Sequence, residues 1–336
     1  MAQHGPARER GVIELVAPAP RTELTGGYRY NRRIAEALGA EMRYAPGEPA
    51  LPAHDGPRVI DSLCFAPGFA APGAGRRDIL LAHSLPSLDP TAGRAEVAER
   101  ARREAALALR FRGAIAPSRF MARTLVARGF RRGTVRVVPP GGCASAAGER
   151  AAAPGAGEPV RVVTVAAWHR GKGQDMLPGV MAACRGLPWS WTFIGHGAEE
   201  GYREGVLDEL RRLGLLDRVR VIDAMDHDEL RALLADSHLF VLPTRVESYG
   251  MAVREAVSAG TPAIVGRCGG TAEALAGSGV AVRPGNTAAW SRAVRRALAD
   301  RAWLAVLGRR AASAPPPPTW EAVARDFAAA AMDIAG

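Results

Sequence analysis

The chain contains 44 lysine and arginine residues in total, but only one of them, Lys172, is a lysine. A coding bias towards arginine, alanine, glycine and proline explains the shortage of lysine but not the exception. Lys172 lies in the segment Trp-His-Arg-Gly-Lys-Gly, residues 168–173, directly after the apolar run 160–167. A flexible ammonium in the turn between a strand and a helix is a common way to hold a phosphate. The alternative is the chance retention of one surface lysine.

Further absences exclude several classes of protein. The four cysteines are far apart and form no CxxC pair, so we expect reduced thiols rather than a disulfide framework or a zinc site; they are Cys64, Cys143, Cys184 and Cys268. No apolar run approaches the ~18 to 20 residues that span a bilayer. The apolar run 12–16 is too short for a signal peptide and contains Glu14. These features predict a cytoplasmic protein.

The net charge of +10 is concentrated in the first half of the chain. Residues 1–155 carry 23 arginines against 14 acidic residues, a balance of +9, and residues 94–136 alone carry 12 arginines. Such a field attracts an anionic partner, either an anionic acceptor or an acidic membrane surface at the inner face. Few aromatic residues interleave with these arginines, so no nucleic acid is expected as a partner. A solvated arginine surface is the alternative.

Short β-rich runs alternate with helical patterns along the chain, which predicts an α/β fold with parallel sheets and helices on both faces. The clearest strands are expected at residues 12–17, 58–61, 79–82, 135–138, 161–166, 191–194, 219–222, 239–242 and 262–265. Helices are expected at residues 30–38, 94–112, 119–128, 204–213, 228–235 and 251–259.

Two changes in composition suggest the domain organisation. Residues 145–159 are rich in glycine and alanine and read as a flexible linker. The strand and turn pattern restarts after it, so we predict one domain over residues 1–144 and a second over 160–314. Four prolines at residues 315–318 predict an extended crossing, after which a helix in the segment 319–336 returns to the first domain.

The densest cluster of chemically useful residues runs from residue 242 to 257, where a strand ends, a turn follows and a helix begins. The backbone N–H groups of Tyr249, Gly250 and Met251 would be free at the helix start, where the macrodipole suits a diphosphate. Glu247 lies in the turn and Glu255 in the helix, so one carboxylate reaches a sugar while the other lies about a nucleoside away. A surface helix residue is the alternative for Glu255.

The histidine and aspartate residues indicate a function less strongly than the cluster at residues 242–257 does. His83 follows the apolar strand at 79–82, at the sheet edge where open α/β sheets bind ligands. A buried histidine that hydrogen-bonds to the backbone is the alternative. No spacing suggests a metal, and Asp226 and Asp228 are interpreted as the start of a helix. No GxGxxG follows the first strand, which disfavours a dehydrogenase.

The sequence around the two glutamates resembles the E-x7-E signature of retaining family 4 glycosyltransferases with the GT-B fold. The matching run is LPTRVESYGMAVREAVSAGTPAIVGRCGGTAEAL, residues 242–275. Residues 26–33, 114–130, 135–142 and 193–244 are similar to further segments of that family, in the same order. The resemblance implies two Rossmann-like domains that face a cleft, with a C-terminal helix that crosses back to the first domain.

The resemblance also implies roles for individual residues. Glu255 would bind the ribose of a nucleotide-diphosphate sugar, Glu247 the transferred sugar, and Lys172 the phosphates. Gly26 and Gly27 would bring backbone N–H groups to the phosphate from the first domain, and His83 would lie near the sugar. A further set would line the nucleotide site, comprising Gly195, His196, Ser248, Tyr249, Gly250 and Met251. The donor is a substrate, so neither a cofactor nor a metal is expected.

Two positions depart from the family pattern. Ala167 stands where the family often has an arginine, for which Arg170 could substitute. Ser248 stands where glycine is common. The first domain is shorter than expected for the family, which suggests a small acceptor. An epimerase or hydrolase of nucleotide sugars, and a non-catalytic nucleotide-sugar binding protein, are the alternative functions.

Overall fold

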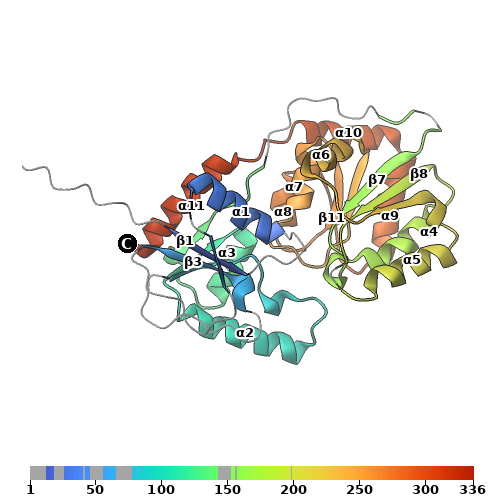
Figure 1. Ribbon diagram of the computed structural model, residues 1–336. Helices are drawn as coiled ribbons and strands as arrows, with labels where there is room; N and C mark the ends of the chain where they lie inside the picture. The colour runs from blue at the N-terminus through green and yellow to red at the C-terminus, as the bar shows by residue number, and fades with distance from the viewer. Residues whose placement is uncertain are drawn as a thin grey trace, which may run out of the picture.

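The computed structural model of the protein describes residues 13–18, 26–40, 42–45, 56–65, 78–142, 153–155, 157–197 and 199–336. Cys143 and most of the predicted linker 145–159 lie outside these residues. The described residues form two lobes that lie side by side, each built on its own sheet (Figure 1). The predicted residue bounds of the two domains stay predictions.

Two six-stranded sheets, parallel throughout, form the centres of the two domains. The first has the order β2-β1-β3-β4-β5-β6, with the strands Glu14–Pro18, Met42–Ala45, Arg58–Asp61, Asp78–Leu81, Gly113–Ala116 and Val135–Val137 for β1 to β6. The second has the order β12-β11-β10-β7-β8-β9, with Val160–Val165, Trp189–Ile194, Val219–Ile222, Leu239–Leu242, Ala263–Gly266 and Gly279–Val282 for β7 to β12.

Helices cover both faces of each sheet. In the first domain these are α1 (Gly26–Leu38), α2 (Arg94–Ala108), α3 (Arg119–Ala127) and α11 (Trp320–Ala335). In the second they are α4 (Leu177–Ala183), α5 (Tyr202–Arg212), α6 (His227–Asp236), α7 (Met251–Ser258), α8 (Thr271–Leu275), α9 (Thr287–Ala299) and α10 (Arg301–Ala312). Among the described residues, none of these helices combines the length and apolar character needed to cross a bilayer.

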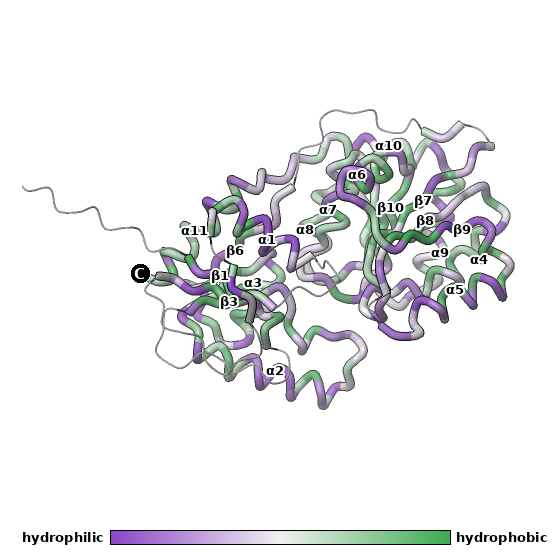
Figure 2. Tube along the Cα trace, in the orientation of Figure 1, coloured by the Kyte–Doolittle hydropathy of each residue, from purple (hydrophilic) through white to green (hydrophobic). Residues whose placement is uncertain are grey.

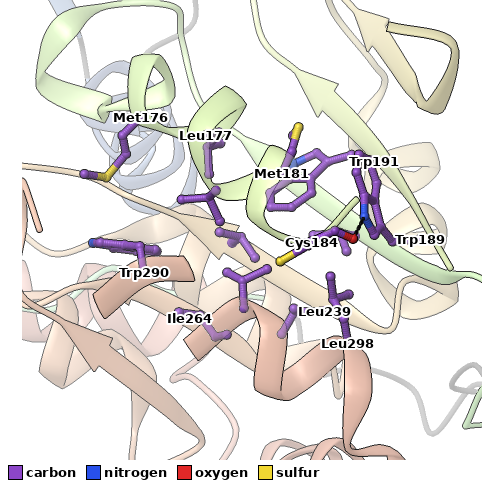
Figure 3. Packing of buried hydrophobic residues seen from close by; sticks show 14 of the residues in the cluster. Met176, Leu177, Met181, Cys184, Trp189, Trp191, Leu239, Ile264, Trp290 and Leu298 are labelled. Atoms are coloured by element: carbon purple, nitrogen blue, oxygen red, sulfur yellow. Dashed lines mark hydrogen bonds between the residues drawn. The ribbon is translucent and has the colours of Figure 1, made fainter. Parts of the chain in front are cut away.

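The strands of the second sheet are apolar on both faces because helices bury both. Adjacent residues of one strand point to opposite sides, so Leu239 packs with α4, α5 and α9, while Phe240 packs with α6 and α7. The central strands β7 and β10 accordingly appear as hydrophobic in Figure 2. On the first of these faces Trp189, Trp191 and Trp290 fill the core, and the Trp189 indole donates to the Cys184 carbonyl at 2.9 Å (Figure 3).

The C-terminal helix crosses back to the first sheet, as predicted. Residues 315–318 belong to no helix or strand, and the Pro318 carbonyl accepts the N–H of Gly142 at 3.0 Å. In Figure 1, α11 then lies beside α1. Phe327 and Ala331 are fully buried there in one cluster with Tyr30 of α1. Gly142 and Pro318 therefore lie side by side where the described chain leaves and re-enters the first domain, and the last helix completes the core of that domain.

Most predicted elements are present, with two corrections that affect the site. The helix predicted at 94–112 ends at Ala108, and Leu109 after it is 86% exposed. The helix predicted at 30–38 begins earlier, because Gly26 and Gly27, which were expected to bring backbone N–H groups to the phosphate, are the first two residues of α1. Strands β2, β5 and β12 were not among the predicted strands. Asp226 caps α6 in a capping box with Glu229, as its interpretation as a helix start required.

Replacing Phe327 with alanine should destabilise the first domain by about 3–5 kcal/mol, because a fully buried phenyl ring would leave a cavity. Met332→Ala, in the same helix but 44% exposed, is the matched control and should change stability by less than about 0.5 kcal/mol. Urea unfolding followed by circular dichroism measures both. Equal effects of the two substitutions would show that α11 does not complete this core.

Candidate active site

Each sheet has one point at which the strand order reverses, and the candidate residues gather at these points. In the second sheet the reversal lies between β7 and β10, which are hydrogen-bonded neighbours. Parallel strands end at the same edge, and open α/β sheets bind ligands in the crevice outside that edge. The loop after β7 carries Lys172 and the loop after β10 carries Glu247. The fold therefore brings the two residues together from 75 positions apart.

The backbone of one loop holds the backbone of the other. The Gly171 carbonyl accepts the N–H of Arg245 at 2.8 Å and the hydroxyl of Thr244 at 3.2 Å. Gly173 has φ +72°, and a Cβ there would lie 2.3 Å from the Pro243 carbonyl oxygen. Only glycine fits this combination of left-handed backbone and close approach. The glycines on either side of Lys172 thus fix where its side chain begins.

Lys172 and Glu247 form an ion pair, with Nζ 2.5 Å from Oε1. Their side chains are 22% and 12% exposed, so both are largely removed from solvent. The Glu247 carbonyl also accepts the N–H of Gly270 at 3.0 Å, which ties the turn to the start of α8. An ammonium has three donors, so two remain for another acceptor while Glu247 takes one.

The N-terminus of α7 presents backbone amides beside this pair. Gly250 has φ +102° at the N-cap position, and no side chain caps the helix. The N–H groups of Tyr249, Gly250 and Met251 make no hydrogen bond to a described residue. Tyr249 itself is buried in the core, and burial raises the pKa of its phenol. The amides and the helix dipole thus make the start of α7 electropositive, and its role as a diphosphate site stays a prediction.

Glu255 projects from the second turn of α7 and pairs with a residue of the first domain. The Arg29 guanidinium lies 2.9 Å from its Oε1, and the same guanidinium contacts Nδ1 of His227 at 3.0 Å. Burial, followed by the charge of Arg29, lowers the pKa of His227 below its usual value. Glu255 is thus available to a ligand only if that ligand shares it with Arg29 or displaces Arg29.

His83 lies on the first-domain side of the cleft, next to the start of α1. A Cβ on Gly27 would lie 3.1 Å from the imidazole Cγ, so a side chain there would press on the ring. A Cβ on Gly26 would lie 3.3 Å from the sulfur of Met251 across the cleft. Gly26, Gly27, His83 and Met251 were predicted as site residues, and the structure brings them together.

A chain of hydrogen bonds orients the His83 ring. Its Nε2 lies 2.8 Å from Oδ1 of Asn31, whose Nδ2 donates to Asp61 at 2.6 Å. Because the Asn31 amide gives its N–H to a carboxylate, its oxygen faces the ring and Nε2 must carry the proton. Nδ1 is then the acceptor atom, and it has no hydrogen bond to a described residue. His83 is therefore not the backbone-bonded histidine of the alternative interpretation.

Ser248 belongs to the second domain and makes two hydrogen bonds to the first. Its hydroxyl donates to the His83 carbonyl, and its own carbonyl accepts the Ser118 hydroxyl at 2.5 Å. Nearby, the carboxylate of Glu273 accepts the N–H groups of Arg119 and Phe120 at 3.0 and 3.1 Å, at the N-terminus of α3. These contacts join the loop before α7 and helix α8 of the second domain to α3 and to the loop after β4, and Figure 1 shows this side of the second domain facing the first.

The remaining predicted residues lie at the rim of the site. Arg170 pairs with Glu199 at 2.6 Å and is 63% exposed, so its guanidinium is already engaged by a carboxylate. Gly195 packs against the end of β7, where a Cβ would lie 1.9 Å from the Ala166 carbonyl oxygen. The carbonyl of His196 accepts the Trp168 N–H at 2.9 Å. The substitution of Arg170 for a family arginine stays a prediction.

Two cavities border the site. One of about 700 Å³ lies between residues 84–91 of the first domain and the loop 169–171, and it is also lined by Arg100, Glu199 and Val246. The other, of about 540 Å³, lies between α6, α7 and the two chain crossings, and Glu255 lines it.

Among the described residues, no cluster of three or more His, Cys, Asp or Glu side chains could hold a metal ion.

Sequence reasoning missed the residues that join the two domains at the site, namely Arg29, Ser118 and Glu273, and the two that orient the His83 ring, Asn31 and Asp61. Arg29 and Asn31 fall inside the quoted segment 26–33, but their spacing gave no sign of their partners. Glu273 belongs to the run after the second glutamate. Each contact joins residues distant in sequence, so the pattern of one segment could not show it.

The chain is similar in sequence to known glycosyltransferases over its second domain. Residues 159–300 match the family described as Glycosyl transferases group 1. Glycogen synthase of Mycobacterium tuberculosis is 34% identical over 113 residues, which are 33% of this chain and 27% of that protein. D-inositol 3-phosphate glycosyltransferase of Salinispora tropica is 34% identical over 126 residues, 37% of this chain and 25% of that protein. The matched residues thus span about a quarter of the length of these curated relatives.

Solved structures resemble the whole fold. Sucrose-phosphate synthase from Thermosynechococcus elongatus superposes with a TM-score of 0.74 at 20% identity, covering 95% of this chain and 98% of that one. The Anabaena protein HepE, in complex with UDP-glucose, has a TM-score of 0.70 at 16% identity with the same coverage. The architecture is the GT-B fold that the sequence predicted.

The His83 ring should stay neutral below pH 6.5, its ordinary pKa, because burial lowers the pKa more than the charge of Asp61 raises it. Nitrogen-15 spectra of the imidazole during a pH titration measure this, and they should show Nε2 as the protonated nitrogen. The pKa of His83 is lower in the folded state than in the unfolded state. The contribution of His83 to the free energy of unfolding is therefore full above pH 6.5 and is lost as the pH falls through the folded-state pKa. Protonation at Nδ1 at neutral pH would contradict the assigned orientation of Asn31.

Proposed function

We propose that the protein is a retaining glycosyltransferase of family 4, which moves a sugar from a nucleotide-diphosphate sugar to a hydroxyl group of a small acceptor. The observation that carries the proposal is the Lys172 and Glu247 ion pair at the strand-order reversal, beside the uncapped start of α7. This arrangement offers a cation, free amides and a carboxylate around one point. The match of residues 159–300 to Glycosyl transferases group 1 supports it.

The donor lies along the edge of the second sheet. Its diphosphate accepts hydrogen bonds from the two remaining donors of Lys172 and from the amides of Tyr249 to Met251. Glu247 then contacts the transferred sugar and Glu255 the ribose. Because Arg29 holds Glu255 at 2.9 Å, donor binding requires Arg29 to share or release that carboxylate. Gly26 and Gly27 form the wall of the site on the side of the first domain.

The reaction breaks the bond between the anomeric carbon of the sugar and the oxygen of the terminal phosphate. The acceptor oxygen forms its bond to that carbon on the same face, and its proton passes to the departing phosphate, so no protein base is needed. Lys172 stabilises the charge that develops on the phosphate. A preorganised cation in a partly desolvated site is typically the largest catalytic contribution. The unprotonated Nδ1 of His83 can accept a hydrogen bond from a sugar hydroxyl.

The acceptor occupies the cavity of about 700 Å³ that borders the Lys172 loop, a size that suits a small molecule. Both arginines that line it are already neutralised. Arg100 pairs with Asp89 at 2.9 Å, and Arg170 pairs with Glu199 at 2.6 Å. An anionic acceptor would have to displace these carboxylates, so the lining favours an uncharged polyhydroxyl compound over an anionic one.

Lys172→Gln should lower the rate of donor turnover by about 10²- to 10³-fold, because the leaving phosphate loses its cation. A panel of nucleotide sugars is first screened by thermal shift, since a bound donor raises the melting temperature by mass action. Turnover of the donor that binds is then measured with and without added polyols. Glu255→Gln, by contrast, should weaken donor binding more than it lowers the maximal rate.

The matched control for this experiment is Arg292→Gln, which removes one positive charge from an exposed position of α9 and should leave turnover unchanged. Product analysis without an acceptor distinguishes the alternatives, because an epimerase or hydrolase converts the donor alone and a binding protein does not convert it. Near-normal turnover by Lys172→Gln would rule out the proposed role of the ammonium.

We also propose that the first domain contacts acidic membrane surfaces peripherally from the cytoplasm. Arg102 and Arg103 of α2 are 72% and 76% exposed, and both share the single carboxylate of Glu99. Leu109, directly after this helix, is 86% exposed, and Arg110 and Arg112 follow it. An exposed leucine among excess arginines offers both the charge and the apolar contact that an anionic bilayer attracts.

Neutralising Arg102, Arg103, Arg110 and Arg112 to glutamine should reduce binding to phosphatidylglycerol vesicles by about tenfold or more, since each basic residue near such a surface contributes about 1 kcal/mol. Sedimentation with vesicles measures the effect, and added salt should weaken wild-type binding. The matched control neutralises four exposed arginines of the second domain, Arg211, Arg212, Arg292 and Arg309. Equal binding by both quadruple variants would remove the membrane proposal.

A further inference from the structure

His169 lines the cavity of about 700 Å³ that we assign to the acceptor. It is the N-cap residue of the short 3-10 turn η4 (Arg170–Lys172), which ends at the ammonium of the candidate site. Residues 84–91 of the first domain line the same cavity, and so does Val246, the neighbour of Glu247 in the second. A molecule bound against His169 therefore lies next to the loop that carries Glu247.

The backbone of the turn fixes the imidazole of His169 and its tautomer. The N–H of Gly171 donates to Nδ1 at 3.1 Å, so Nδ1 is an acceptor and the neutral ring carries its proton on Nε2. Burial, followed by the charge of Lys172, lowers the pKa of His169, which keeps the ring neutral at pH 7. A Cβ on Gly171 would lie 2.7 Å from Cε1 of the ring, so glycine at this position lets the ring pack closely against the turn.

Nε2 is the ring nitrogen of His169 that remains available to a ligand. Because Nδ1 and Cε1 pack against the turn, the ring presents the edge with Nε2 and Cδ2 to the cavity that it lines. Nε2 makes no hydrogen bond to a described residue, and it is not fully buried. The guanidiniums of Arg100 and Arg170 line the same cavity, but each is paired with a carboxylate, at 2.9 and 2.6 Å. The Nε2–H thus offers the cavity a neutral donor that no described carboxylate occupies.

We propose that His169 is an acceptor-binding residue, which donates its Nε2–H to a non-reacting oxygen of the acceptor and thereby favours acceptors with more than one hydroxyl group. This inference rests on the proposed function and adds a residue and a substrate feature to it. A hydrogen bond donated to the reacting oxygen would withdraw electron density from the nucleophile, so a second oxygen is the better partner for the imidazole. A neutral donor also suits an uncharged polyhydroxyl compound, which needs no counter-charge from the cavity.

The experiment measures turnover of the nucleotide sugar selected by thermal shift. Glycerol, glucose and myo-inositol are the polyol acceptors, and 1-propanol is the acceptor with a single hydroxyl group. His169→Asn keeps a side-chain oxygen that accepts the Gly171 N–H, as asparagine does at N-cap positions, but its amide does not reach the position of Nε2. It should lower kcat/KM for the polyols by about tenfold, mainly through KM, because the bound acceptor loses one hydrogen bond. Turnover of 1-propanol and affinity for the donor should not change.

The matched control is His238→Asn. His238 also accepts a backbone N–H at Nδ1, from Arg161 at 2.9 Å. It lies directly before β10, at the opposite edge of the second sheet from the Lys172 loop. This substitution makes the same chemical change remote from the cavity and should leave turnover of all four acceptors unchanged.

Wild-type kinetics of His169→Asn with the polyols would overturn the proposal, because His169 would then only cap the turn. An equal loss with the polyols and with 1-propanol would overturn it too. Nitrogen-15 spectra of the wild-type protein need neither turnover nor a variant. Added glycerol should shift the Nε2–H signal of His169 saturably, and the absence of that shift would also contradict the proposal. Failure of the proposed function would appear differently, as no turnover of any nucleotide sugar by the wild type.

Discussion

The ion pair between Lys172 and Glu247 is the contact on which the candidate site depends. It exists because β7 and β10 are neighbours at the one place where the strand order of the second sheet reverses, so that the loops after them diverge and leave a crevice. The Gly171 carbonyl, bonded to Arg245 N–H at 2.8 Å, fixes the two loops against each other. The ammonium is therefore held in place before any ligand arrives, and this preorganisation makes a charge useful in catalysis.

The second constraint is that the first domain supplies the other wall of the same site. Ser248 donates to the His83 carbonyl, Glu273 holds the start of α3, and Arg29 holds Glu255. The last of these contacts occupies the carboxylate that we assign to the donor ribose. Donor binding and domain contact therefore compete for Glu255, and exchange of Arg29 for a ribose hydroxyl would link binding to a change in the interface.

The sequence predicted most strands of the two sheets because their signals are local. Apolar runs marked β7 and β10, and the glycines beside Lys172 and at Gly250 marked sharp turns that the structure confirms by φ +72° at Gly173 and +102° at Gly250. The short strand β5, Gly113–Ala116, has small residues and gave no comparable signal. Contacts such as Asn31 with His83 join residues 52 positions apart, and only the folded chain shows them. Helix α2 was predicted to run to residue 112 because Arg110 and Arg112 continue its charged pattern, whereas it ends at Ala108 and is followed by the exposed Leu109.

A structure determined with a nucleoside diphosphate bound tests the central claim most directly. The account predicts Nζ of Lys172 within hydrogen-bonding distance of a phosphate oxygen, the amides of Tyr249 to Met251 on the same diphosphate, and Glu255 on the ribose with Arg29 displaced or shared. A diphosphate held elsewhere, with the Lys172 and Glu247 pair intact and remote from it, would contradict the account.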